Sequence, residues 1–217
     1  MDDKDNLPEH LAKYTRHLVT NHPKVAVAYQ DIVDRLERSG AGGSSPRVGD
    51  ILPPFQLPND CGQFVSSADL LANGPMIVSL NRGHWCYYCR YELQALQESI
   101  KQITELGANI VAITPETQTY ANRLKAQCGL EFPVLSDVDN GYALSIDLAI
   151  WLGKDIKPLY DDLGYDLEQF QRNAGLMVPI PASYVVDTDG RIVAEFVDPD
   201  FRKRMATSDI IAALKKL

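Results

Sequence analysis

The chain of 217 residues has no long apolar run, no excess of positive charge and few cysteines. No stretch approaches the roughly 20 apolar residues that a membrane-spanning helix needs. The first residues, Met1-Asp2-Asp3-Lys4-Asp5, are acidic and lack the apolar segment of a secretory signal, so we expect a cytoplasmic protein. The formal net charge of −8 would repel nucleic acid and anionic membrane, so we expect neither as a partner.

The four cysteines are Cys61, Cys86, Cys89 and Cys128. A cytosolic chain of this length does not need structural disulfides, and its compartment would reduce them. Two of the four, Cys86 and Cys89, form the pattern Trp85-Cys86-Tyr87-Tyr88-Cys89. In a reducing compartment such a close pair indicates redox chemistry or metal binding rather than a structural bridge.

The Cys86/Cys89 pair lies where an apolar run, predicted to be a buried strand over 76–80, gives way to a long amphipathic helix. Free N–H groups and positive potential at a helix N-terminus stabilise a thiolate. The spacing puts both sulfurs on one face of the first turn, and Arg82 and Arg90 flank the pair. We therefore predict a nucleophilic thiolate with a resolving thiol beside it.

Two other interpretations of the pair are open. A zinc site would need two more ligands, and the spare thiols Cys61 and Cys128 are not a second close pair, so we predict no metal. Alternatively, the two cysteines are inert, small core residues. His84 adjoins the pair too closely in sequence to be a natural ligand; we take it first as a loop residue and keep open a role in handling protons.

Hydrophobic periodicity predicts strands alternating with helices, in the order β-α-β-α-β-α-β-β-α. This order is typical of an α/β fold in which a central mixed sheet is flanked by helices. The expected strands cover about 51–55, 63–65, 76–80, 109–113, 133–135, 183–186 and 191–196. The expected helices of the main domain cover about 89–107, 117–128, 140–152 and 207–216.

The chain divides into a helical amino-terminal arm with a linker, residues 1–45, and a main domain over 46–217. Pro8 and Pro23 open two helical segments, and a Gly- and Ser-rich stretch at 40–46 predicts a flexible linker. The arm packs either on its own domain or on a partner subunit. Apart from a short helix around residues 167–173, residues 153–180 fit no regular element well and are interpreted as an insertion, either a functional lid or a surface excursion.

Four segments, in order, resemble the alkyl hydroperoxide reductase/thiol-specific antioxidant (AhpC/TSA) family of the thioredoxin-like superfamily. They begin with the Val48–Pro58 segment and continue with an Arg-Gly-x-Trp-Cys-x-x-Cys signature that contains Trp85. Phe132–Asp137 and Pro181–Asp187 extend the similarity. The resemblance covers about residues 48–200 and implies a thioredoxin-like fold with a peroxiredoxin-like site.

The resemblance implies two different assignments of the cysteines. In thioredoxin-like reductases Cys86 attacks and Cys89 resolves, a cis-proline (here Pro181) faces the pair, and Ile180 offers backbone hydrogen bonds to the substrate. In peroxiredoxins Cys89 takes the peroxidatic position, Cys86 that of a threonine and Arg82 that of a proline. The chain departs from peroxiredoxins because that proline and threonine are absent and Pro181 replaces an arginine.

Three functions follow from these observations. The first is a thiol-dependent peroxidase that reduces hydrogen peroxide or organic hydroperoxides through Cys86 and Cys89. The second is a thioredoxin-like reductase of protein or small-molecule disulfides, and the third is a non-enzymatic redox-sensing or binding module. The first two are oxidoreductases that need no cofactor, and we expect an external thiol reductant such as thioredoxin or glutathione. The arm and the family resemblance also suggest a homodimer.

Overall fold

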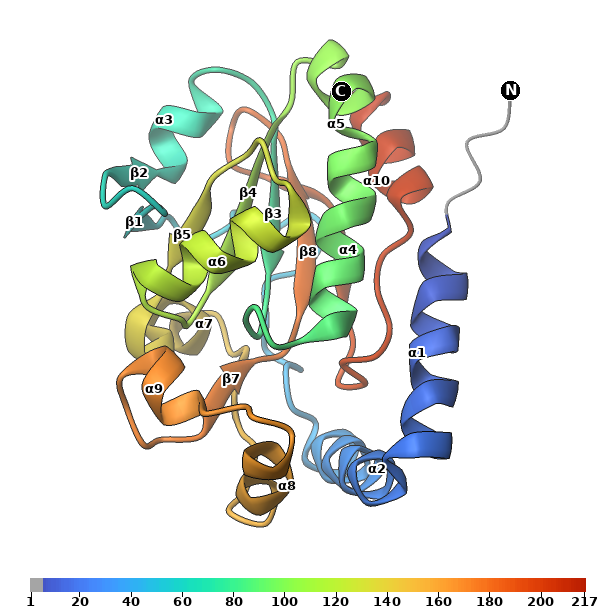
Figure 1. Cartoon of the computed structure of the whole chain (residues 1–217). Helices are drawn as coiled ribbons and strands as arrows, with labels where there is room; N and C mark the ends of the chain where they lie inside the picture. Colours follow the sequence, from blue (N-terminus) through green and yellow to red (C-terminus); the bar gives the residue numbers. More distant parts are fainter. Residues whose placement is uncertain (1–5) are drawn as a thin grey trace.

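A mixed five-stranded sheet forms the centre of the molecule in a computed structural model that describes residues 6–217 (Figure 1). The strand order is β5-β4-β3-β8-β9: β3, β4, β5 and β9 run parallel to one another, and β8 runs antiparallel to them. Two short hairpin-like pairs, β1-β2 and β6-β7, lie outside this sheet. The strands are β1 (Gln56–Pro58), β2 (Phe64–Ser66), β3 (Met76–Leu80), β4 (Asn109–Thr114), β5 (Val134–Ser136), β6 (Ala149–Trp151), β7 (Met177–Pro179), β8 (Ala182–Val186) and β9 (Ile192–Val197).

Helices cover both faces of the sheet and one of its ends. The helices are α1 (Leu7–Asn21), α2 (Pro23–Ser39), α3 (Ser67–Leu71), α4 (Tyr87–Glu98), α5 (Ile100–Glu105), α6 (Gln118–Cys128), α7 (Gly141–Ser145), α8 (Ile156–Asp162), α9 (Leu167–Gln171) and α10 (Thr207–Leu214), with a short 3₁₀ turn η1 (Val138–Asn140). In residues 6–217 no helix combines the length and apolar character needed to cross a lipid bilayer.

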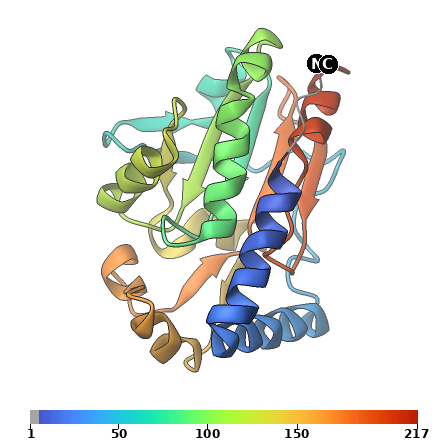
Figure 2. The ribbon, with the colours of Figure 1, turned by 45° about the vertical axis from the view of Figure 1, so that its right-hand side comes forward.

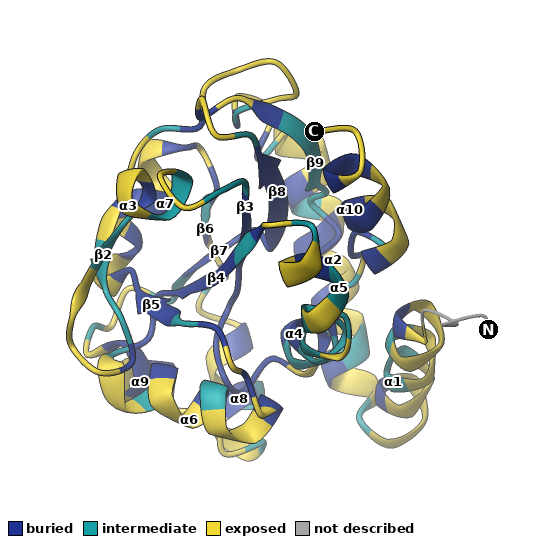
Figure 3. Cartoon of the chain, turned by 90° about the horizontal axis from the view of Figure 1, so that it is seen from above, coloured by how far each residue is buried: buried dark blue, intermediate teal, exposed yellow. Residues whose placement is uncertain are grey.

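The side chains of the central strands alternate between two apolar clusters, one on each face of the sheet. Ile77 of β3 belongs to the cluster under α4, α6 and α10, whereas its neighbour Val78 faces the cluster that includes α2 and α8. Every residue of β3 and β8 is buried, and the exposed residues form the outer surfaces of the helices (Figure 3). Successive side chains along each strand therefore point to opposite faces of the sheet. The predicted mixed α/β architecture of a thioredoxin-like fold is confirmed.

The amino-terminal arm packs on its own chain. Helix α1 lies beside α4, and α2 crosses the end of the sheet below them (Figures 1 and 2). Pro23 stands in the first turn of α2, and Gly40 ends that helix in the left-handed conformation. Five residues of α2 join the larger apolar cluster, namely Val25, Tyr29, Ile32, Val33 and Leu36. Both predicted helical segments are present, and their apolar faces bury against the same domain.

The segment 40–46 is packed and hydrogen-bonded instead of forming the loose tether that its composition suggested. Ser45 is buried, and its hydroxyl donates to the Gly42 carbonyl at 2.7 Å. The backbone N–H of Ser44 donates to the Asp147 carboxylate at 2.9 Å. A Cβ at Gly42 would meet Ile180 Cδ1 at 3.1 Å. The glycine thus permits close approach of two chain segments, which is a different use of glycine from flexibility.

Several stretches differ from the predicted elements. Residues 153–180, expected to be largely irregular, also form α8 and β7, and the predicted helix over 89–107 is divided into α4 and α5. Residues 51–55 make only one isolated bridge, from Ile51 to Arg191, and the strand begins at Gln56. The predicted helix over 140–152 is wrong in its second half, where β6 pairs antiparallel with β7. An apolar run of this length fits either state, so periodicity alone could not distinguish them.

Candidate active site

Cys86 is the N-cap residue of α4 and follows directly from the loop after β3. Its backbone is extended, and its Sγ accepts a hydrogen bond from the Cys89 backbone N–H at 3.4 Å. Cys89 lies one turn later with its Sγ accepting from the Arg82 backbone N–H, also at 3.4 Å. The Cys86 side chain is 4% exposed and Cys89 is 0% exposed. The pair therefore has an outer thiol at the helix end and an inner thiol behind it, both reduced.

Burial, hydrogen bonding and nearby charges give the two thiols different pKa values. Burial alone would raise the pKa of Cys86, but hydrogen bonding with the Cys89 thiol and the positive charges of Arg82 and Arg204 outweigh it and lower that pKa to about 6. Burial and the Cys86 thiolate raise the pKa of Cys89 well above the ordinary range, despite the charge of Arg204. At neutral pH Cys86 is thus the thiolate and Cys89 the protonated thiol, which is the division of roles that a nucleophile and its resolving partner need.

A buried network of hydrogen-bonded charged side chains contacts the Cys89 sulfur. Arg204 donates from Nη2 to Cys89 Sγ at 3.3 Å and from Nε to Glu92 Oε2 at 2.6 Å. The other Glu92 oxygen accepts from Ser183 Oγ at 2.6 Å and from Ser79 Oγ at 3.3 Å. Two sheet strands, helix α4 and the segment before α10 meet in this network. It places a guanidinium beside the inner sulfur, where it stabilises negative charge that reaches Cys89 during thiol exchange.

Arg82 occupies an aromatic cage on the other side of the pair. Its guanidinium lies over Phe201 at 4.1 Å from the ring centroid and over Trp85 at 5.0 Å. Its Nη2 donates to the Tyr160 hydroxyl at 2.8 Å, while Tyr29 of α2 closes a further side. Cation–π contacts and one neutral acceptor leave the charge of Arg82 without a carboxylate partner in this cage. Together with hydrogen bonding to Cys89 and the charge of Arg204, that unneutralised charge lowers the pKa of Cys86.

His84 and Glu116 fix the loop that carries the cysteines. Glu116 accepts from the His84 backbone N–H at 2.8 Å, and its second oxygen lies 2.6 Å from His84 Nδ1. The imidazole stacks on Tyr120 and meets the edge of Phe170. Gly83 permits this geometry, since φ is +135° and a Cβ there would approach the Glu116 carboxylate to 2.6 Å. Of the two roles considered for His84, the loop role has a clear structural basis in these contacts.

Aromatic side chains from the amino-terminal arm and from the 153–180 segment pack on the aromatic residues next to Cys86. Tyr14 of α1 stacks on Tyr87 with ring centroids 5.0 Å apart and meets Tyr88 edge-on at the same distance. Trp85 packs against Tyr160 and Tyr165, which belong to the 153–180 segment. Both the arm and that segment therefore contribute side chains to the surroundings of the site.

The remaining residues predicted to support the site lie differently. Arg90 stacks its guanidinium on Tyr87, 4.8 Å from the ring centroid, and the charges that most lower the pKa of Cys86 are those of Arg82 and Arg204. The predicted cis bond at Pro181 is wrong, because the peptide is trans. Ile180 is fully buried, and its N–H donates to the Leu148 carbonyl at 2.7 Å. This bond continues the β6-β7 pairing, so the Ile180 N–H is already paired and does not offer a hydrogen bond to a substrate.

Sequence reasoning missed Arg204 because its neighbours look like a solvated charge run. Arg202 and Lys203 do pair with nearby aspartates close to the surface. Arg204 instead turns inward between the apolar residues Phe201 and Met205, and this apolar flanking is the one available signal. In residues 6–217, no three His, Cys, Asp or Glu side chains gather in a geometry that could hold a metal ion.

Comparison with known proteins identifies relatives with thiol chemistry. The model of the AhpC/TSA family matches residues 48–195. The thiol-disulfide oxidoreductase ResA of Bacillus anthracis is 25% identical over 161 residues, which are 73% of this chain and 75% of ResA. A protein of Mycobacterium tuberculosis named as a predicted peroxiredoxin is 28% identical over 145 residues, which are 67% of this chain and 81% of its own.

Solved structures of peroxiredoxins share the fold. Peroxidoxin BcpB of Mycobacterium tuberculosis superposes with a TM-score of 0.61 at 18% identity, over 79% of this chain and 97% of its own. A mutant of PrxQ from Xylella fastidiosa gives a TM-score of 0.60 at 13% identity, over 80% of this chain and 96% of its own. At these identities the likeness is one of fold.

Proposed function

The chain belongs to the AhpC/TSA family and is an oxidoreductase of the thioredoxin-like superfamily; from this premise we propose that it is a peroxidase that reduces hydrogen peroxide or organic hydroperoxides through Cys86 and Cys89. One observation carries the proposal. The acidic thiol of Cys86 is only 4% exposed, and Tyr14 stacks on the neighbouring Tyr87, so a small oxidant suits this site better than a disulfide held in a folded protein.

The proposed reaction has three steps. The Cys86 thiolate attacks one oxygen of the hydroperoxide, the O–O bond breaks, and the alkoxide leaves and takes up a proton, so that Cys86 becomes a sulfenic acid. The Cys89 sulfur then displaces water from that sulfenic acid and forms the Cys86–Cys89 disulfide. An external thiol reductant returns both cysteines to the thiol form; we propose a thioredoxin-type donor or glutathione in the cytoplasm. Arg82 and Arg204 stabilise the anionic sulfur in these steps.

The test uses reduced wild-type protein and the variants Cys86→Ser and Cys89→Ser, with Cys128→Ser as the control thiol. We expect Cys86→Ser to lower peroxide consumption about a hundredfold or more, because the nucleophile is gone. Cys89→Ser should complete one turnover and accumulate a sulfenic acid on Cys86 that dimedone traps. A sulfenic acid on Cys89, with peroxide consumption surviving in Cys86→Ser, would contradict the assignment and favour the alternative peroxiredoxin alignment.

A disulfide reductase is the second candidate, and the order of the acidities favours it. The low-pKa thiol is the first cysteine of the pair at a helix N-terminus, as the resemblance to thioredoxin-like reductases implies. The same proteins would be assayed with insulin and with a small aromatic disulfide. Disulfide reduction that depends on Cys86, together with negligible peroxide turnover, would replace the peroxidase by the reductase.

A further inference from the structure

Tyr160 of α8 contributes a buried hydroxyl to the surroundings of the cysteine pair. Its side chain is 1% exposed, and its ring centroid lies 5.1 Å from that of Trp85, the residue before Cys86. Its hydroxyl accepts a hydrogen bond from Arg82 Nη2 at 2.8 Å. Through Tyr160, the 153–180 segment therefore bonds directly to a charged residue of the site.

The hydrogen bonds of Tyr160 leave its own proton unused. A guanidinium has only N–H donors, so Tyr160 is the acceptor in its bond with Arg82. Burial raises the pKa values of both Tyr29 and Tyr160, and the hydrogen bond between them raises the first further but lowers the second. That pattern makes Tyr29 the donor and Tyr160 again the acceptor. The Tyr160 O–H proton therefore has no acceptor among residues 6–217.

Tyr160 keeps this proton at neutral pH until a strong base forms beside it. Burial raises the pKa of Tyr160 above the ordinary value of about 10, although the charge of Arg82 acts in the other direction. Hydroxide and alkoxides are much stronger bases than a phenolate, so either of them takes the proton from a neighbouring tyrosine. The donors Arg82 and Tyr29 are already in place to stabilise the phenolate that results.

The proposed peroxidase reaction needs a proton at one defined moment. When the Cys86 thiolate attacks and the O–O bond breaks, negative charge moves from sulfur to the leaving oxygen, which becomes an alkoxide or hydroxide. Cys86 reacts as the thiolate and brings no proton, so a neighbouring group must supply it. His84 is engaged with Glu116 at 2.6 Å through Nδ1. Tyr160, by contrast, carries a proton that no described residue binds.

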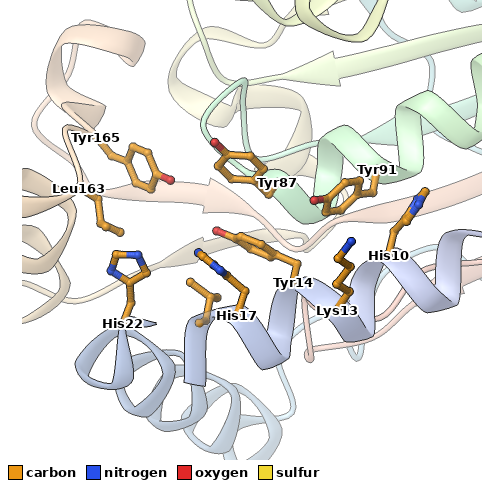
Figure 4. Close-up of a pocket in the computed structure, with 10 residues that line it drawn as sticks. His10, Lys13, Tyr14, His17, His22, Tyr87, Tyr91, Leu163 and Tyr165 are labelled. Carbon is orange, nitrogen blue, oxygen red and sulfur yellow. The ribbon is translucent and has the colours of Figure 1, made fainter. Parts of the chain in front are cut away.

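Open space borders the aromatic layer that contains Tyr160. A groove of 480 Å³ lies between α1 and the start of α4, and Tyr87 and Tyr165 form part of its lining (Figure 4). A second cavity, of 290 Å³, is lined by Tyr160 and Tyr165 among others. The Tyr165 ring packs on Trp85 and on Tyr160, at centroid distances of 5.7 and 5.8 Å. Space for a molecule of a few atoms therefore exists on both sides of Tyr165, next to the ring of Tyr160.

We propose that Tyr160 is the general acid of the peroxidase reaction and donates its proton to the oxygen that leaves when the O–O bond breaks. The proposal rests on the proposed peroxidase function and adds a catalytic residue to it. The Cys86 thiolate bonds to one peroxide oxygen; the other leaves with the electron pair of the O–O bond, takes the Tyr160 proton and departs as an alcohol or water. The Tyr160 phenolate, held by Arg82, then regains a proton from solvent, and Cys89 closes the disulfide as described above.

The experiment compares ethyl hydroperoxide with peracetic acid, which are similar in size but differ in the group that leaves. Ethyl hydroperoxide releases ethoxide, which needs a proton, whereas peracetic acid releases acetate, which needs none. The rate constant of Cys86 oxidation is measured in a single turnover of the full chain. We expect Tyr160→Phe to lower it about a hundredfold for ethyl hydroperoxide, the size of a lost general acid. For peracetic acid we expect no loss, which also shows that the variant is folded.

Tyr142→Phe is the matched control, because it also removes a buried tyrosine hydroxyl, one that donates to the Pro53 carbonyl at 2.9 Å. It should leave both rate constants unchanged. The pH midpoint of Cys86 alkylation should be the same in Tyr160→Phe as in wild type.

An unchanged rate constant for ethyl hydroperoxide in Tyr160→Phe would overturn the proposal. Equal losses for the two peroxides, or a raised alkylation midpoint, would overturn it as well, because Tyr160 would then act only by positioning Arg82. Wild-type protein in which neither peroxide oxidises Cys86 would overturn the proposed peroxidase itself, and this proposal with it.

Discussion

At the scale of single residues, the site differs from an isolated cysteine pair through its two buried arginines. Cys86 and Cys89 differ in acidity although they lie in one helical turn. Both sulfurs are buried, but hydrogen bonding with Cys89 and the charges of Arg82 and Arg204 lower the pKa of Cys86, whereas burial and the Cys86 thiolate raise the pKa of Cys89. Burial and charge thus act in opposite directions on two chemically identical groups.

The pH dependence of alkylation tests this acidity. The thiolate is the reactive form, so labelling of Cys86 by iodoacetamide should be full above its pKa of about 6 and fall as the pH drops through that value. Cys89→Ala should move the midpoint upward by about one pH unit, since the hydrogen bond that stabilises the thiolate is lost. Cys128→Ala should leave the midpoint in place. Peptide mapping by mass spectrometry would show a midpoint near the ordinary thiol value of about 8.5 if the prediction is wrong.

The buried pair of Arg204 and Glu92 should matter for stability as well as for chemistry. Arg204→Met leaves a buried carboxylate without its cation, so we expect a loss of about 3 kcal/mol in the free energy of unfolding in urea. Adding Glu92→Gln to that variant should recover a large part of the loss, because the unpaired charge is removed. Additive losses in the double variant would show that the two side chains do not act as a pair.

The sequence predicts those parts of the site whose residues lie close together in the chain. It does not predict the partners that come from distant segments. The two cysteines and Arg82 are within one octapeptide, and the helix boundary beside them is marked by periodicity. Arg204 and Tyr160 reach the same place from segments far along the chain. No local pattern identifies such partners, because their positions depend on tertiary packing alone.

At the scale of elements, the amino-terminal arm and the 153–180 segment are parts of the site rather than additions to it. Strands and helices with strong periodicity, such as β3 and α6, were predicted within a residue or two. The chain from 140 to 180 was not, because its short helices and the β6-β7 pair each depend on contacts with other segments. Short elements are stabilised by packing more than by their own propensity.

The packing of the segment between α2 and β1 can be tested by substituting two glycines, one of which serves as the control. Gly42→Ala places a Cβ 3.1 Å from Ile180 Cδ1 at a φ of +76°, so strain and overpacking add to about 3 kcal/mol of lost stability. Gly40→Ala has a similar φ of +66° with no atom within 4 Å, and should cost about 1 kcal/mol. Urea unfolding of both variants measures the difference. Equal losses would mean that the segment is a loose tether after all.

At the scale of the whole molecule, the two apolar clusters unite the arm with the sheet. Side chains of α2 share one cluster with β3, β8 and the cysteines. No boundary of weak packing separates residues 7–39 from the rest in this cluster, so we expect one cooperative unfolding transition.

Substitutions on the two faces of α2 test that cooperativity. Ile32→Ala in the buried face should lower the free energy of global unfolding by about 3 kcal/mol, as a core substitution in the sheet would. Val27→Ala, at a side chain that is 62% exposed, should change it by less than about 0.5 kcal/mol. Far-ultraviolet circular dichroism and the fluorescence of the two tryptophans, Trp85 and Trp151, should report a single midpoint. A separate, earlier transition that is the only one shifted by Ile32→Ala would show that the arm unfolds independently of the sheet.

The stacking of Tyr14 over the residues between the cysteines has a kinetic consequence. Under the proposed function, we expect a peroxide to pass these rings, and we expect a macromolecular donor to need the displacement of α1 before its thiol reaches the Cys86–Cys89 disulfide. Under the proposed function, the oxidative half-reaction then scales with peroxide concentration, whereas the reductive half-reaction reaches a ceiling fixed by the opening of one helix. The waiting time for that opening, rather than sulfur chemistry, would set the pace of the cycle when peroxide is abundant.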